Sequence, residues 1–138
     1  MNTMWGMAVR GICEYDGKYL LLKIRSASSH DAGKWEFPGG KVKRSEFFDE
    51  ALKREYLEET GLEIDLVSLY NTLQHDYVAC KTGEKVKSIQ IIMKVTANSD
   101  EVTISNEHDM YGWFTKEEIK EMIKNNQLTP PAKRALCR

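Results

Sequence analysis

Polar and apolar residues alternate along several short stretches of the chain, with the period of two that is typical of a half-buried β-strand. The clearest stretch is residues 86–96, where Ile89, Ile91 and Met93 recur at every second position. Asp16 and Gly17 have the composition of a hairpin turn. With these and other turn residues as boundaries, strands are predicted over residues 7–14, 18–25, 35–37, 62–70, 72–79, 86–96 and 110–114. The strand over 72–79 is expected to pair with 86–96 across a turn at 81–84.

Two further stretches have the apolar spacing of an α-helix. The first is predicted over residues 45–60, with Ser45 as its N-cap. The second is predicted over residues 116–126, where Thr115 and Glu118 form a capping box at its start. The tail beyond it is expected to begin extended and to end in a helical turn. Mixed strands with a central and a terminal helix predict an α/β (α+β) sandwich, with residues 1–138 as one domain.

Acidic side chains lie on an unexpected face of the first predicted helix. At 100° per residue, its apolar side is marked by Phe47, Phe48, Ala51 and Leu52. Glu55, Glu58 and Glu59 fall within the same arc of roughly 120°. Carboxylates beside a core-facing stripe are costly unless protons, basic partners or a metal ion compensate them.

The helical geometry leaves two interpretations of these acids open. Arg54 precedes Glu58 by four residues and can pair with it, as in the solvated face of many charge-rich helices. The negative charge that remains is also suited to a hard divalent cation. Mg²⁺ takes oxygen ligands, keeps several waters and commonly bridges to substrate phosphates.

The stretch from Gly40 to Leu62 resembles the Nudix box. That pattern is Gly, five residues, Glu, seven residues, Arg-Glu, an aliphatic, any residue, Glu-Glu, any residue, Gly and an aliphatic. The positions in register are Gly40, Glu46, Arg54, Glu55, Glu58, Glu59, Gly61 and Leu62. The departure is Tyr56 at the first aliphatic position, a conservative change in a site expected to be partly buried. A spaced pattern of this length is far more specific than a lone glycine motif.

The resemblance implies a Nudix hydrolase with an α/β/α sandwich, a mixed sheet, a central box helix and a C-terminal helix. It implies hydrolysis of nucleoside diphosphates linked to another group, with Mg²⁺ as cofactor and Mn²⁺ as a substitute. The implied metal ligands are Glu55, Glu58 and Glu59, together with the Gly39 carbonyl. Arg54 is expected to hold a metal-site glutamate in place, as groups around metal ligands commonly do.

Residues before the box resemble the MutT branch of the family, which removes oxidised purine nucleoside triphosphates. Arg25, His30 and Phe37 fall at that branch's spacing and would contact the nucleotide, with Lys41 also assigned to the substrate. The alternatives are a surface-loop role for His30 and a core position for Phe37.

A second MutT-like feature is Glu107, six residues before Trp113. The branch places an additional metal-binding or base glutamate at this spacing. Either Glu55 or Glu107 is then expected to take a proton from water. His108, Asp109 or an ordinary acidic loop remain alternatives.

The third feature is Pro130-Pro131-Ala132-Lys133, where the MutT branch has an asparagine in place of Lys133. Asparagine offers a donor and an acceptor, whereas lysine offers donors only. The difference favours a base with exposed acceptors, and pyrimidine triphosphates remain open as substrates.

The composition limits the partners that we expect. With 20 basic and 21 acidic residues, the chain has no charge excess that would favour a nucleic acid or membrane surface. Its three cysteines do not have metal-site or disulfide-framework spacing. We expect a cytoplasmic monomer or homodimer, with no signal peptide or membrane span, acting on a small nucleotide.

The leading prediction is therefore hydrolysis of a nucleoside triphosphate to a monophosphate and pyrophosphate, with an oxidised or modified nucleotide left open as the substrate. The alternative is a pyrophosphatase that acts on ADP-ribose, a nucleotide sugar or a dinucleoside polyphosphate. A third alternative is a domain that binds nucleotide without catalysis. The sequence disfavours it, because such a domain has no evident need for all the acidic residues of the box.

Overall fold

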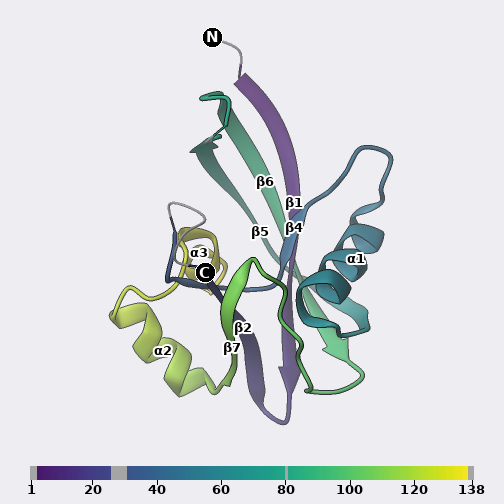
Figure 1. Ribbon diagram of the computed structural model, residues 1–138, viewed down its shortest axis with the longest axis vertical. Helices are drawn as coiled ribbons and strands as arrows, with labels where there is room; N and C mark the ends of the chain where they lie inside the picture. Colours follow the sequence, from purple (N-terminus) through teal and green to yellow (C-terminus); the bar gives the residue numbers. More distant parts are fainter. Residues whose placement is uncertain (1–2, 26–30, 80, 137–138) are drawn as a thin grey trace.

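The computed structural model describes residues 3–25, 31–79 and 81–136. Within these residues, seven strands form a curled, mixed sheet between helices (Figure 1). The strands are β1 (Thr3–Tyr15), β2 (Lys18–Ile24), β3 (Trp35–Glu36), β4 (Gly39–Lys41), β5 (Ile64–Val78), β6 (Lys85–Ala97) and β7 (His108–Phe114). The helices are α1 (Phe48–Thr60), α2 (Lys116–Lys124) and α3 (Pro130–Leu136).

The long strand β1 is at the centre of the sheet. The main strand order is β3-β2-β1-β6-β5, with β4 paired to β1 and β7 paired to β2. β1 and β6 run parallel from Thr3 opposite Lys85 to Cys13 opposite Val95, whereas the other strand pairs are antiparallel. The predicted pairing of the β5 and β6 stretches is thus confirmed.

Helices cover both faces of the sheet and give it two cores. On one face, α1 packs through Ala51, Leu52 and Tyr56, all fully buried. On the other face, Ile119 of α2 and Ala132 of α3 belong to a second buried cluster. This arrangement confirms the expected α/β/α sandwich (Figure 1).

Residues 62–70 and 72–79 do not form the two strands that were predicted. They belong mostly to one strand, β5, whose register against β6 shifts after Leu66 and again after Leu69. Such shifts are β-bulges, which disturb the alternation of side chains without ending the strand. The break in the alternation of polar and apolar residues between the two predicted strands therefore marks bulges in one strand rather than a turn between two.

The start and the apolar face of α1 also differ from the prediction. Its N-cap is Phe47, whereas Ser45 has a φ of 71° in the preceding turn, where the Glu46 carboxylate accepts from the Lys43 N–H at 2.9 Å. Phe47 is 74% exposed and Phe48 39% exposed, whereas Ala51 and Leu52 on the same side are fully buried. The prediction of Ser45 as the N-cap, and of both phenylalanines on the buried face, was wrong.

Tyr56 occupies a site that is more buried than expected. Its side chain is fully buried, and its hydroxyl donates to the carbonyl oxygen of Gly11 at 2.6 Å. A Cβ atom on Gly11 would lie 2.7 Å from Cε2 of Tyr56. The glycine on β1 thus makes room for the ring, and its carbonyl satisfies the buried hydroxyl.

The C-terminal helices agree with most of the sequence pattern. Thr115 Oγ1 accepts from the Glu118 N–H at 3.1 Å, and the Glu118 carboxylate accepts from the Thr115 N–H at 2.9 Å, which confirms the capping box. The tail differs, since α3 begins directly at Pro130. Among the described residues, we find no helix with the length and apolar character that crossing a bilayer requires.

Cys13 is expected to be inert toward thiol reagents in the folded protein. It is fully buried on β1, and burial raises the pKa of its thiol to about 11. The thiolate is the reactive form, so little of it exists at pH 8. Mass spectrometry of the Cys13 peptide should show no alkylation by iodoacetamide in buffer and full alkylation in guanidinium chloride. Fast alkylation of the native protein would contradict this packing.

Candidate active site

Two adjacent glycines bring α1 close to β1. Gly39 and Gly40 form part of β4, which pairs with β1. A Cβ atom on Gly39 would lie 2.1 Å from the carbonyl oxygen of Val9, and one on Gly40 would lie 2.6 Å from Cδ of Glu55. Only residues without a side chain permit this approach, which places the β4 backbone directly beside the acids of α1.

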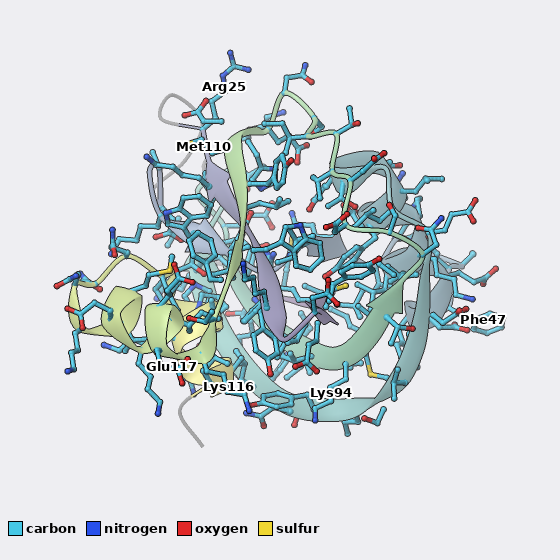
Figure 2. The ribbon with its side chains drawn as sticks, turned by 90° about the horizontal axis from the view of Figure 1, so that it is seen from below. Arg25, Phe47, Lys94, Met110, Lys116 and Glu117 are labelled. Atoms are coloured by element: carbon cyan, nitrogen blue, oxygen red, sulfur yellow. The ribbon has the colours of Figure 1, made fainter. Side chains whose placement is uncertain are left out.

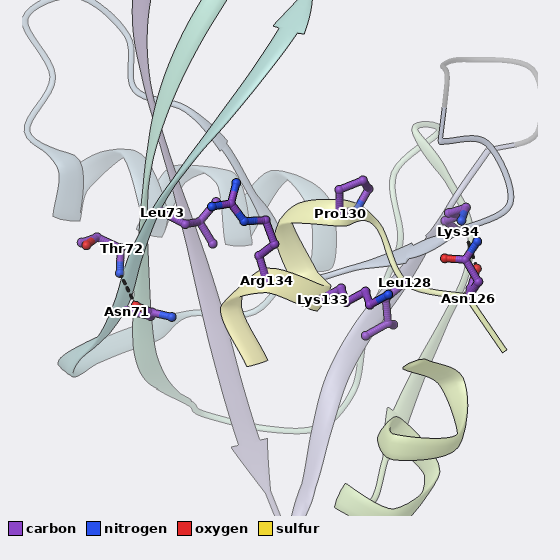
Figure 3. Close-up of a pocket in the computed structure, with 9 residues that line it drawn as sticks. All are labelled: Lys34, Asn71, Thr72, Leu73, Asn126, Leu128, Pro130, Lys133 and Arg134. Atoms are coloured by element: carbon purple, nitrogen blue, oxygen red, sulfur yellow. Dashed lines mark hydrogen bonds between the residues drawn. The ribbon is translucent and has the colours of Figure 1, made fainter. Parts of the chain in front are cut away.

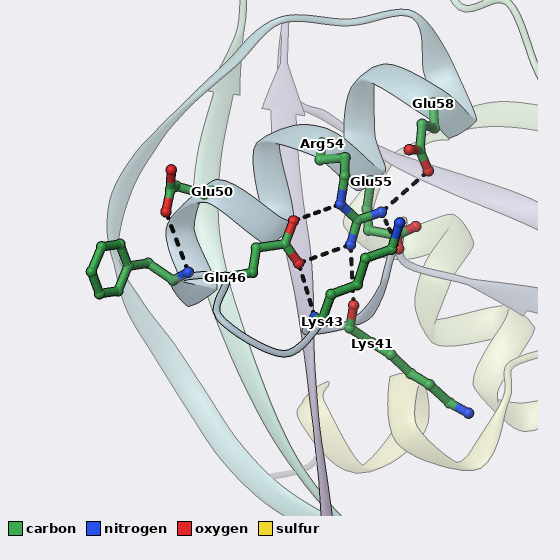
Figure 4. Close-up of polar contacts among 8 residues, drawn as sticks. Lys41, Lys43, Glu46, Glu50, Arg54, Glu55 and Glu58 are labelled. Atoms are coloured by element: carbon green, nitrogen blue, oxygen red, sulfur yellow. Dashed lines mark hydrogen bonds and ion pairs between the residues drawn. The ribbon is translucent and has the colours of Figure 1, made fainter.

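Arg54 is the centre of a cluster of ion pairs on α1. Its guanidinium donates to Glu46 at 2.6 Å, to Glu55 at 3.0 Å and to Glu58 at 3.3 Å (Figure 4). It also donates to the carbonyl of Lys41 at 3.2 Å. The hydrogen bonds from Arg54 hold the pKa of Glu46 down at about 2. The predicted pairing of Arg54 with Glu58 is present, and Arg54 also fixes the loop before the helix.

Four glutamates surround one cavity of about 220 Å³. Glu55, Glu58 and Glu59 come from α1, whereas Glu107 comes from the loop before β7, together with Ser105 and Asn106. Glu107 is thus brought to the α1 acids from a position about fifty residues away in the chain. The resulting cavity is lined on opposite sides by carboxylates.

Beneath this cavity lies a buried network of charged side chains that sequence reasoning did not identify. Arg10 Nη1 lies 3.2 Å from the Glu36 carboxylate and also donates to the Phe37 carbonyl at 2.8 Å. The other oxygen of Glu36 lies 2.9 Å from Nε2 of His108, while Nδ1 of His108 is buried without a partner among the described residues. The available signal was Arg10 and Glu36 standing between apolar neighbours in predicted strands.

Glu59 connects the network to the cavity. It is 5% exposed, and its carboxylate accepts from the Gly39 N–H at 3.2 Å. Burial, reinforced by the negative charges of Glu36 and Glu55, raises the pKa of Glu59 above its usual range, and Arg10 opposes the shift. A nearby cation would strongly stabilise the ionised form of a carboxylate in this environment.

The comparisons with known proteins agree with this geometry. The family model described as NUDIX domain matches residues 4–136. The chain belongs to the Nudix family. A similar protein, nucleoside triphosphatase NudI from Klebsiella pneumoniae (strain 342), is 31% identical over 119 residues, which cover 83% of this chain and 84% of that protein. The family membership and these relatives make the chain a MutT-like Nudix hydrolase.

Solved structures give the same result. A MutT protein from Methanosarcina mazei Go1 matches with a TM-score of 0.77 and 26% identity, over 98% of this chain and 92% of that one. A MutT Nudix hydrolase from Burkholderia pseudomallei matches with a TM-score of 0.75 and 26% identity, over 96% of each chain. These similarities confirm the Nudix fold across nearly the whole length of this hydrolase.

Arg25 of this Nudix hydrolase contacts the loop that carries Glu107. Its guanidinium donates to the Asn106 carbonyl at 2.8 Å and lies 4.0 Å from the Asp109 carboxylate. The backbone N–H of Arg25 donates to the Glu107 carbonyl at 3.1 Å. His108 is turned into the buried network, so Glu107, rather than His108 or Asp109, lines the glutamate cavity beside Ser105 and Asn106. His30 lies outside the described residues.

Phe37 and Lys41 lie in contrasting environments. Phe37 is fully buried in the core beside α2 and α3, as the alternative interpretation of this residue expects. Lys41 is exposed at the end of β4, with Nζ 5.9 Å from the centre of the Tyr77 ring. Lys41 is therefore accessible to a ligand beside the two glycines, whereas Phe37 is not exposed to solvent.

Lys133 lies at a larger cavity of about 640 Å³ beside α3 (Figure 3). Leu73 of β5, together with Leu128 and Pro130, supplies apolar lining, and Asn71 and Asn126 supply polar groups. Lys34, Lys133 and Arg134 add donor groups to the lining, so the cavity combines a donor-rich rim with apolar surface. Its size is sufficient for a nucleoside.

The glutamate cavity fits a divalent cation by the chemistry of its donors. Among the described residues, no three acidic, histidine or cysteine side chains are already arranged as a metal site. Arg54 instead engages one oxygen each of Glu55 and Glu58. Carboxylate oxygens are nevertheless the ligands that Mg²⁺ and Mn²⁺ accept, and four such groups line this cavity.

Replacement of Gly40 by alanine is expected to lower kcat by about tenfold or more, because displaced catalytic groups lose productive geometry. The added Cβ would meet the Glu55 carboxyl group at 2.6 Å and push it away. Gly6 on β1 is the matched control, since its added Cβ would meet Val86 at an ordinary 3.6 Å. Steady-state kinetics and thermal unfolding of G40A and G6A test this. Equal kcat values for the two variants would contradict the close approach.

Proposed function

We propose that this Nudix hydrolase converts a nucleoside triphosphate and water to a nucleoside monophosphate and pyrophosphate, with Mg²⁺ as its cofactor. The observation that carries the proposal is the cavity lined by Glu55, Glu58, Glu59 and Glu107. The similarity to a nucleoside triphosphatase over most of both chains supports the substrate class. Mn²⁺ would use the same oxygen ligands.

The proposed cation ligands are Glu55, Glu58, Glu59 and Glu107, with the Gly39 carbonyl beside them. A divalent ion bound there supplies neutralisation of phosphate oxygens and Lewis acidity. Arg54 restrains Glu55 and Glu58 through its hydrogen bonds. Little side-chain conformational entropy would therefore be lost when these carboxylates take up their positions in the reaction.

One carboxylate of the cavity acts as general base in the proposed mechanism. Glu55 or Glu107 takes the proton of the attacking water, and the phosphorus–oxygen bond to the pyrophosphate leaving group breaks. Glu55 is restrained by Arg54, whereas Glu107 is exposed and approaches from the opposite loop. Both positions border the space that the reacting phosphate would occupy.

The base and sugar are proposed to occupy the cavity beside α3. Lys133 would donate to acceptor atoms of the base, and Leu73 and Leu128 would contact its face. Arg25, which contacts the loop of Glu107, and Lys41, at the end of β4, would contact the substrate near the glutamates. A base rich in acceptors on one edge suits this donor set better than one that needs an acceptor in return.

The test is release of pyrophosphate from a nucleotide panel, with Mg²⁺, with Mn²⁺ and with EDTA. The panel holds normal and oxidised purine triphosphates, pyrimidine triphosphates, ADP-ribose and a dinucleoside polyphosphate, with a monophosphate assay for the last two. Metal-dependent pyrophosphate release from a triphosphate is expected. Turnover of ADP-ribose or the dinucleotide alone would reject the proposed substrate class, and no turnover of any member would reject catalysis on these substrates.

A further inference from the structure

A second cavity, of about 310 Å³, lies between the sheet and α2. Its inner surface is apolar, because Ile12, Phe37 and Ile119 contribute to it from the second core. These three side chains are at most 6% exposed. The cavity is thus a gap in an otherwise packed core that opens toward solvent.

Three lysines surround the opening of this cavity. Lys94 extends from β6, whereas Lys116 and Lys120 extend from α2, and Figure 2 shows Lys94 and Lys116 on the same side of the molecule. In the described part of the chain, none of the three has a carboxylate within 4.0 Å. An apolar cavity whose rim carries ammonium groups without a carboxylate partner in the described part of the chain is complementary to an amphipathic anion.

Two tyrosines define the shape of the cavity between the core and the lysines. Tyr70 lies beneath Lys94, whose Nζ is 5.7 Å from the centre of the ring. Burial and the negative charge of Glu14 raise the pKa of Tyr19, and the positive charge of Lys116 at the rim opposes the shift. Flat aromatic walls favour a flat ligand, since aromatic rings pack by offset stacking or edge-to-face contact.

We propose that this cavity binds a small aromatic carboxylate of one or two rings. The ring system enters against Phe37 and Ile119, and the carboxylate remains at the rim beside Lys94 and Lys120. The volume is at the lower end of the range for small-molecule pockets, roughly 300–1,000 Å³, and so excludes larger ligands from full burial.

The proposed site is separate from the glutamate cavity. The glutamates line the α1 side of the sheet and share no lining residue with the lysine-rimmed cavity. It also shares no lining residue with the cavity beside α3. Binding here can therefore be measured without turnover of a nucleotide.

The test is an NMR titration of the ¹⁵N-labelled protein with 2-naphthoate and with the neutral 2-naphthalenemethanol. Backbone shifts around Ile119 and Phe37 are expected to move with 2-naphthoate, and the neutral analogue should bind more weakly. The double variant K94E/K120E should bind 2-naphthoate about tenfold or more weakly, because the new carboxylates at the rim repel the carboxylate of the ligand. The control K53E/K124E changes net charge equally at exposed lysines that do not line the cavity.

Three outcomes would overturn the proposal: no shifts at the cavity, equal binding of the neutral analogue, or equal weakening by K53E/K124E. Displacement of 2-naphthoate by a nucleoside triphosphate would also overturn it as a separate site. Retained binding in the presence of excess nucleotide supports it, whatever the outcome of the pyrophosphate assay.

Discussion

Replacement of Glu58 by glutamine is expected to lower kcat by at least about 100-fold, the effect typical of losing a catalytic carboxylate or cation ligand. The amide is close in size to the carboxylate but is neutral, so it neither neutralises a cation nor accepts a full charge-assisted hydrogen bond from Arg54. Glu58 lines the glutamate cavity, and its side chain is 56% exposed, so the fold does not depend on its burial.

The measurement is steady-state pyrophosphate release by E58Q, together with nucleotide binding and thermal unfolding. KM and the unfolding midpoint should change far less than kcat. Arg54 retains Glu46 and Glu55 as partners, which preserves the local structure. Asp49→Asn is the matched control, because Asp49 is an exposed acid in the first turn of the same helix. Unchanged turnover by E58Q would remove Glu58 from the proposed cation site.

Replacement of Arg10 by methionine is expected to lower the free energy of unfolding by about 3 kcal/mol, as is typical when one partner of a buried ion pair is removed. Arg10 lies 3.2 Å from Glu36, with side chains that are 17% and 16% exposed. It is also the positive charge that opposes the raised pKa of Glu59. Without it, two poorly solvated carboxylates lose their counterion.

Urea unfolding of R10M measures this effect. Arg44→Met is the control, since Arg44 is exposed and the same change there should be nearly neutral. Adding Glu36→Gln to R10M should recover part of the lost stability, because the uncompensated charge at Glu36 is then removed. Equal midpoints for R10M and R44M would show that the buried network contributes little to folding.

Local patterns in the sequence predicted the elements well where neighbouring residues decide the structure. The capping box of Thr115 and Glu118 forms as expected, because both hydrogen bonds join residues three positions apart. The same locality placed Glu55, Glu58 and Glu59 on one side of α1, and all three line the same cavity. The prediction failed at Ser45, whose backbone conformation is set by the turn before the helix.

Local sequence patterns did not predict the contacts between residues that are far apart in the sequence. The bulges in β5 depend on its register against β6, which no local alternation encodes. The network of Arg10, Glu36 and His108 joins residues up to 98 positions apart in the sequence. Each of these residues alone resembles an ordinary charged position, and only their burial together shows that they form one group.

The sequence by itself determined that this chain is a Nudix hydrolase, because the spacing of its glycines and acids specifies a helix with carboxylates on one face. The tertiary structure alone decided what surrounds that helix. It brought β4 against α1, buried Glu59 above Arg10, and opened a lysine-rimmed cavity on the far side of the sheet. The physical reason is range: helical and capping patterns act over a few residues, whereas burial and charge pairing depend on which strands pack together.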